Sequence, residues 1–215
     1  MPNMLTLDQF RRAADLSDAR ANRWYSPLVV AMTEFDIDTP QRQAAFISQI
    51  RVESTGFSRV TENLNYAPEG LLATFPPQRI NRRQAYQLGR QPGEKVVPQA
   101  RQEQIANLVY GGRYGNDRPG DGWRYRGRGL KQLTFYDNYL RCGHALELDL
   151  IAQPELLEHD DLAARSAGWF WYANKCNVQA DAGNITLLTR IINGGANGLE
   201  RRNDYYKQAF DVLCR

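Results

Sequence analysis

Glu53 is the residue whose type and position most clearly suggest chemistry. It follows Phe46 and Ile50 along a predicted helix at a spacing that makes its carboxylate continue an apolar stripe. Burial at such a position is expected to raise the pKa of the carboxyl group, as a general acid requires near neutral pH. Helix phase alone favours a plainer role, in which the carboxylate caps the neighbouring backbone or pairs with an arginine such as Arg51 or Arg59.

A second carboxylate makes a catalytic role for Glu53 more plausible than helix phase alone does. Glu62 lies nine residues further on, in the polar segment 61–66, beyond a predicted helix end and a glycine turn. One partly desolvated and one solvated carboxylate are the arrangement used for glycosidic bond cleavage. Inverting enzymes hold the two groups roughly 6.5–9.5 Å apart, with a water between them. The spacing permits that separation, although Glu62 taken alone could simply be a cap partner of Asn63 or Asn65.

The segment 125–134 (Tyr-Arg-Gly-Arg-Gly-Leu-Lys-Gln-Leu-Thr) is expected to form the wall of a ligand site. Its glycines allow close backbone approach, and Gln132 and Thr134 would lie on one side of an extended strand, where they could hold a water or sugar hydroxyls. A dinucleotide-binding role is excluded because the third glycine and the βαβ unit are missing. Further on, Asn193 presents an amide at the helix end within 192–198.

Helical periodicity dominates the chain and predicts a mainly α fold. Caps, prolines and glycines set the helix boundaries, and seven of the 17 glycines fall within 111–129, which is therefore expected to be a loop or short hairpin. The predicted helices are 9–16, 19–24, 27–35, 41–54, 68–74, 81–89, 99–110, 136–146, 162–173, 185–193 and 199–213.

Composition excludes several functional classes. Two histidines among 215 residues argue against zinc hydrolases and against Ser-His-Asp or Cys-His enzymes, so neither metal nor cofactor is expected. The three cysteines do not suggest a disulfide framework. No apolar run is long enough for a membrane span, and residues 1–18 lack the apolar core of a signal peptide.

Charge is unevenly distributed, although the net charge of +3 alone does not indicate nucleic-acid binding. Residues 79–128 contain eleven Arg or Lys against four Asp or Glu, a net +7, and the remainder is net −4. This basic and aromatic middle segment indicates a surface for an anionic polymer. A solvated face of a small subdomain would explain it equally well.

Four motifs, in this order, resemble those of glycoside hydrolase family 19. They are 53–57 (Glu-Ser-Thr-Gly-Phe), 62–66 (Glu-Asn-Leu-Asn-Tyr), 125–134 and 192–195 (Ile-Asn-Gly-Gly). The resemblance is strongest to the bacteriophage and prophage endolysin branch. It includes the preceding segment 35–46 and covers essentially the whole chain.

The resemblance implies a lysozyme-like, two-lobed helical fold and an inverting mechanism without a cofactor. Residues 1–215 would form a single catalytic domain, with a small helical subdomain at about 67–115 and no separate wall-binding domain. The implied roles are general acid for Glu53, general base for Glu62, a ligand of the attacking water for Thr134, and substrate binding for Tyr125, Gln132, Asn138, Asn193 and Arg202, with Arg201 as the alternative arginine.

Several positions depart from the family pattern and bear on substrate preference. Val52 replaces a common histidine, Thr55 and Gly56 a Gly-Gly pair, Lys131 an apolar residue and Phe135 a glycine. The basic segment favours peptidoglycan glycan strands as the partner, cut by a monomer that waits in the host cytoplasm before lysis and does not insert stably into a membrane. A chitinase, a lytic transglycosylase and an inactive sugar-binding module remain the alternatives.

Overall fold

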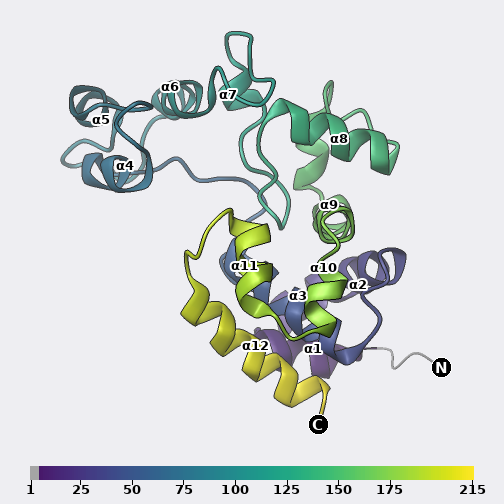
Figure 1. The fold of residues 1–215 in the computed structure, drawn as a ribbon. Coiled ribbons are helices and arrows are strands. Elements are labelled where there is room, and N and C mark those ends of the chain that lie inside the picture. Colours follow the sequence, from purple (N-terminus) through teal and green to yellow (C-terminus); the bar gives the residue numbers. More distant parts are fainter. Residues whose placement is uncertain (1–4) are drawn as a thin grey trace. The chain divides into compact units, whose positions relative to one another are not determined.

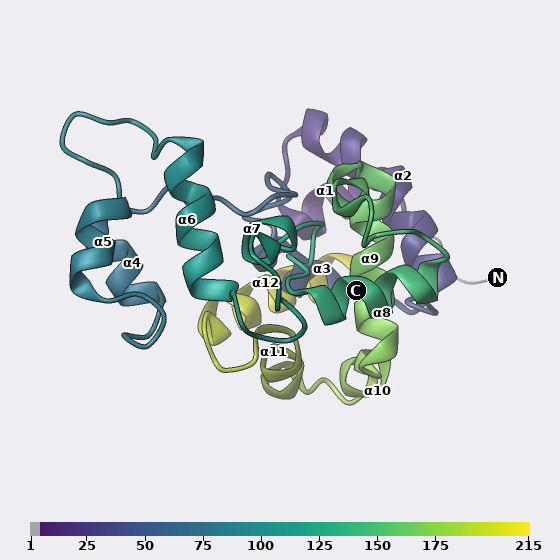
Figure 2. The ribbon, with the colours of Figure 1, turned by 90° about the horizontal axis from the view of Figure 1, so that it is seen from above.

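The computed structural model describes residues 5–215, and all regular elements in that part of the chain are helices (Figures 1 and 2). The mainly α fold is therefore confirmed. No strand forms in the glycine-rich segment; it contains loops and the short helix α7 (Asp121–Arg124). Within the described residues, no helix is long and apolar enough to cross a lipid bilayer. The chain divides into two compact units.

The first unit comprises the described chain up to Val60, Arg128–Gln132 and Glu155–Arg215. Helix α3 lies at its centre and contacts α1, α10, α11 and α12 (Figure 1). The helices of this unit are α1 (Leu7–Ala14), α2 (Asp18–Glu34), α3 (Pro40–Glu53), α9 (Asp160–Ala173), α10 (Cys176–Asp181), α11 (Ile185–Asn193) and α12 (Leu199–Leu213).

Helix α3 begins where its capping residues predict. The Thr39 hydroxyl accepts a hydrogen bond from the Arg42 N–H (3.2 Å), and Pro40 occupies the first turn, where no backbone donor is needed. Residues 43–50 are all buried, so this helix is enclosed on every side. That enclosure fixes the direction in which the last turn, ending at Glu53, presents its side chain.

Helix α2 shows that packing overrides a local signal. The prediction of two helices separated before Pro27 was wrong, because the structure has one continuous helix. A proline inside a helix costs about 3 kcal/mol. Trp24, Leu28 and Met32 are buried on the same helix, and each such side chain contributes about 1.5–3 kcal/mol, which outweighs that cost.

Two short elements were not predicted, namely α10 and the 3₁₀ helix η1 (Pro154–Glu158). Asn177 shows why α10 forms: its side chain accepts a hydrogen bond from the Trp171 indole (2.7 Å) and donates to the carbonyls of Phe35 (3.3 Å) and Asp36 (3.0 Å). Phe35 and Asp36 lie more than 140 residues from Asn177 in sequence, so local periodicity does not indicate the helix.

The second unit comprises Thr61–Gly127 and Leu133–Pro154. Residues 67–115, predicted as a subdomain, lie within it. Its core contains Leu64, Leu71, Ile80 and Val109 among other buried apolar side chains. Helix α6 contacts both α5 and α7 (Figure 2). The helices are α4 (Pro68–Thr74), α5 (Arg82–Leu88), α6 (Gln99–Tyr110), α7 and α8 (Tyr136–Leu146).

Candidate active site

Glu53, the last residue of α3, is held by cations. Its Oε1 accepts a hydrogen bond from Arg202 Nη2 (2.5 Å), and its Oε2 lies 3.8 Å from Lys131 Nζ. The predicted enclosure is present, since only 12% of the Glu53 side chain is exposed. The predicted apolar surroundings were wrong, whereas the alternative of pairing with an arginine holds, with Arg202 as the partner in place of Arg51 or Arg59. Arg51 instead pairs with Asp15 (2.8 Å).

Arg202 is a positioning residue for Glu53. It is 1% exposed, and Nη1 donates to Gln49 Oε1 (2.6 Å) while Nε donates to the Asn197 carbonyl (3.4 Å). Such burial is incompatible with the predicted sugar contact, so that assignment is corrected. The choice between the two neighbouring arginines is also resolved, because Arg201 is exposed and Arg202 reaches the carboxylate.

Lys131 is an unexpected member of this group. Its ammonium lies 4.5 Å from the centroid of the Phe170 ring, and its side chain is only 11% exposed. Desolvation lowers the pKa of Lys131, and Arg202 lowers it further, whereas the nearby Glu53 carboxylate opposes this shift. Burial therefore disfavours the Lys131 cation, and the ion pair with Glu53 partly offsets this effect.

Glu62 lies in the second unit and is also fixed by specific partners. Oε1 accepts a hydrogen bond from the Tyr110 hydroxyl (2.5 Å), and Oε2 accepts one from the Gly127 N–H (3.2 Å). Desolvation raises the pKa of Glu62, against the lowering effects of Tyr110, Gly127 and Arg126. The expectation of a solvated Glu62 is therefore wrong. Burial, which was predicted for Glu53, is the largest influence on the pKa of Glu62.

Replacement of Tyr110 by phenylalanine is expected to shift the acidic limb of the kcat/KM profile to higher pH. The hydroxyl stabilises the ionised carboxylate, so its loss raises the pKa of Glu62 further and protonates the proposed base over a wider acidic range. A charge-assisted hydrogen bond contributes about 1.5–3 kcal/mol, so its loss is expected to lower kcat/KM about tenfold or more at the acidic end of the profile. A pH–rate profile with an unchanged acidic limb would contradict this role.

The segment around Gln132 is a turn and not the predicted extended strand. Gln132 has a φ of 56°, and both its backbone N–H (3.1 Å) and its side-chain amide (2.9 Å) donate to the Gly129 carbonyl. Asn138 donates to the Thr134 carbonyl (2.8 Å) at the start of α8. The predicted alternation of Gln132 and Thr134 on one strand face is therefore absent, and the amides of Gln132 and Asn138 both bond to backbone.

Tyr125 is part of the core of the second unit. It is 3% exposed, its ring packs against Tyr136 and Tyr139, and its hydroxyl donates to the Ile151 carbonyl (3.3 Å). This burial corrects the predicted substrate contact to a packing role. Asn193, in contrast, is exposed at the end of α11, where Gly194 caps the helix with a φ of 74°.

Tyr110 and Gln49 are site residues that sequence reasoning missed. Gln49 lies one helical turn before Glu53, and this i, i+4 spacing was a usable signal for a shared partner. Tyr110 is 48 residues from Glu62, and no local pattern connects them. Lys131 was noticed only as a departure from the family.

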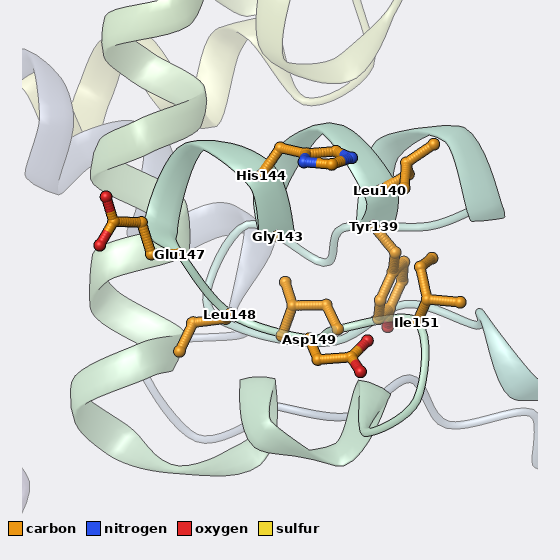
Figure 3. Close-up of a pocket in the computed structure, with 9 residues that line it drawn as sticks. Tyr139, Leu140, Gly143, His144, Glu147, Leu148, Asp149 and Ile151 are labelled. Carbon is orange, nitrogen blue, oxygen red and sulfur yellow. The ribbon is translucent and has the colours of Figure 1, made fainter.

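Figure 3 shows a separate pocket of about 470 Å³ beside α8 in the second unit. None of the predicted catalytic or sugar-binding residues lines it. Its titratable groups are His144, Glu147 and Asp149. Across residues 5–215, no group of three or more His, Cys, Asp or Glu side chains is placed to hold a metal ion.

Each of the two units contains one enclosed carboxyl group that can supply acid–base chemistry. Glu53, in the first unit, is bound by a guanidinium, and Glu62, in the second, is bound by neutral donors. Two titratable groups in different environments can divide the roles of proton donor and proton acceptor.

Comparison with known proteins shows consistent similarity. A family model described as chitinase class I matches residues 101–187. A glycosyl hydrolase family 19 domain-containing protein of Haemophilus influenzae is 39% identical over 169 residues, which cover 77% of each chain. Endochitinase 2 of Gossypium hirsutum is 32% identical over 119 residues, covering 43% of this chain and 39% of that protein.

The fold is similar to that of a solved structure. Chitinase C from Streptomyces griseus HUT6037 superposes with a TM-score of 0.63 and covers 98% of this chain and 93% of its own. At 19% sequence identity, this similarity concerns the fold alone.

Proposed function

The chain belongs to glycoside hydrolase family 19, and from that premise we propose that it hydrolyses the β-1,4-linked glycan of bacterial peptidoglycan. As a glycoside hydrolase of chitinase-like ancestry, it acts on a polysaccharide. The observation that carries the two-carboxylate mechanism is that Glu53 and Glu62 are both poorly solvated and are each held by specific hydrogen-bond donors. The division of roles, with Glu53 as acid and Glu62 as base, follows the motifs that resemble those of family 19. Such pairs divide acid and base roles in glycoside hydrolysis.

In the proposed reaction, Glu53 donates a proton to the leaving glycosidic oxygen. Glu62 removes a proton from a water molecule held with Thr134, and that water attacks the anomeric carbon from the opposite face of the sugar. The product has inverted configuration. Arg202 keeps the Glu53 carboxyl group in one orientation, and Tyr110 does the same for Glu62.

Charge supports peptidoglycan as the substrate. Exposed cations of the basic segment 79–128 include Arg82, Arg83, Lys95, Arg118 and Arg124. Peptidoglycan carries acidic peptide stems, whereas chitin is uncharged, so this surface favours the former. Chitin is the second candidate because similar proteins, including Endochitinase 2 and chitinase C, are named as chitinases.

The proposal also includes a biological setting, which is based on the motifs that resemble those of the phage and prophage branch. The protein would act as a monomeric endolysin that stays in the host cytoplasm until the wall becomes accessible.

A lysis assay with product analysis tests the proposed function. Purified protein is expected to clear suspensions of outer-membrane-permeabilised cells, and mass spectrometry is expected to find reducing ends. The Glu53→Gln variant is expected to be inactive. Products with 1,6-anhydro ends would instead show a transglycosylase, and binding without clearing would show an inactive module. Activity on N-acetylglucosamine oligomers without clearing would favour the chitinase.

A further inference from the structure

A partly exposed aromatic and cationic cluster follows the end of α6 in the second unit. It consists of Arg113, Tyr114 and Phe135, and we call it the Arg113 cluster. The Tyr114 and Phe135 rings lie 4.9 Å apart, and the Arg113 guanidinium carbon lies 5.4 Å and 5.0 Å from their respective centroids. Tyr114 is 62% exposed, so the cluster presents a ring to solvent.

The Arg113 cluster is continuous with the proposed general base. Phe135 packs edge-to-face on Tyr110 with a centroid distance of 5.5 Å. The Tyr110 hydroxyl in turn donates to Glu62. One row of contacting side chains therefore connects the exposed ring of Tyr114 with the Glu62 carboxylate, which places the cluster next to the reacting groups.

The backbone beneath the cluster is held in an unfavourable conformation. Tyr114 has a φ of 44° and Phe135 a φ of 79°, in a region that bulky residues rarely adopt. At position 135 the family commonly has glycine, for which such a φ carries no steric cost. Strain of this kind persists where the surrounding structure enforces it, and it concentrates at ligand-binding positions.

Buried hydrogen bonds enforce this conformation. Asn116 is 1% exposed, and its side chain donates to the Tyr110 carbonyl (3.1 Å) and accepts from the Tyr136 N–H (2.9 Å). The Asp137 N–H donates to the Tyr114 carbonyl (3.0 Å). These hydrogen bonds connect the loop 111–116 to the end of α6 and to the start of α8, so Arg113 and Tyr114 are positioned before a ligand binds.

The donors of Arg113 remain available for an anion. Both rings lie against the guanidinium, which leaves its in-plane N–H groups for hydrogen bonding. One of them makes a long bond to the Val109 carbonyl (3.5 Å). Among residues 5–215, no carboxylate is within ion-pair distance of Arg113. A planar guanidinium with free edges suits bidentate binding of a carboxylate.

From these observations we propose that the Arg113 cluster is a substrate subsite for a sugar unit whose substituent carries a carboxylate. The apolar face of the pyranose stacks on Tyr114, and Arg113 pairs with the carboxylate of the lactyl-peptide arm. The inference rests on the proposed function and deepens it, because it assigns the preference for peptidoglycan over uncharged chitin to named residues.

Binding measurements without turnover test the subsite. All variants are made in the Glu53→Gln background, and calorimetry measures the Kd of two ligands: a peptide-bearing N-acetylglucosaminyl-N-acetylmuramic acid fragment and a neutral N-acetylglucosamine tetramer. Arg113→Gln is expected to raise the Kd of the acidic fragment about tenfold, as the loss of a charge-assisted pair would, and to change the Kd of the tetramer by less than about twofold. Tyr114→Ala is expected to raise the Kd of both ligands.

Arg141→Gln is the matched control. It removes the same charge from an exposed position of the second unit that lies outside the basic segment and contacts neither ring, and both Kd values are expected to stay within about twofold. The subsite would be overturned if Arg113→Gln weakened both ligands equally or neither, or if Arg141→Gln weakened the acidic fragment as much as Arg113→Gln does. Hydrolysis is read separately in the lysis assay, so failure of the proposed function and failure of the subsite are distinguishable.

Discussion

Replacement of Glu62 by glutamine is expected to lower kcat by about 10²–10⁴-fold, the contribution of a positioned general base. Glutamine has nearly the same shape and its carbonyl oxygen can still accept from Tyr110, so only the longer bond from the Gly127 N–H (3.2 Å) loses its acceptor. The amide cannot remove a proton from water. Because burial disfavours the charged carboxylate, loss of the charge also relieves a desolvation cost. The Glu62→Gln variant should therefore lose activity without a matching loss of unfolding free energy.

Glu69 provides a matched control within the same unit. It also accepts a hydrogen bond from a tyrosine hydroxyl, that of Tyr86 at 3.0 Å, but it is exposed. Glu69→Gln is expected to retain full activity. The measurement is the initial rate of wall clearance, with thermal unfolding of both variants as a check on folding. Near-full lysis by the Glu62 variant would refute the inverting assignment.

The motifs singled out the two carboxylates, but they did not predict the side chains that contact each carboxylate. Glu53 and Glu62 were both selected from the sequence, yet Glu53 is enclosed by cationic partners instead of apolar ones, and Glu62, expected to be solvated, is buried as well. The reason is that helix phase describes one element, whereas the environment of a carboxylate depends on partners from elsewhere. Arg202 and Tyr110 lie 149 and 48 residues from the carboxylates that they contact. Sequence spacing does not encode such contacts.

The fold was predictable where local chemistry and packing agree. The bounds of α4, α6, α8, α11 and α12 coincide with those predicted, because their apolar periodicity is consistent with their burial. The two failures have different causes. Pro27 continues a helix because buried neighbours stabilise it, and Gln132 adopts a left-handed turn because two of its donors converge on Gly129.

Replacement of Arg202 by methionine is expected to produce the largest loss of stability among the variants considered. Arg202 and Glu53 are 2% and 12% exposed at their side chains, so removing the guanidinium leaves the carboxylate in a poorly solvated position with the more distant Lys131 ammonium (3.8 Å) as its ionic partner. Breaking a buried ion pair from one side typically costs about 3–5 kcal/mol of unfolding free energy. Gln49 loses its partner as well. Urea denaturation at neutral pH measures this loss.

Arg201→Met controls for the loss of one positive charge at the adjacent, exposed position, and a change within about 0.5 kcal/mol is expected. The double variant Glu53→Met/Arg202→Met separates stability from catalysis. Replacing both members of a buried pair by apolar groups is often neutral, so the double variant should recover most of the unfolding free energy while remaining inactive. If Arg202→Met were as stable as the parent, the ion pair would not hold Glu53. If the double variant cleared cell walls, Glu53 would not be the acid.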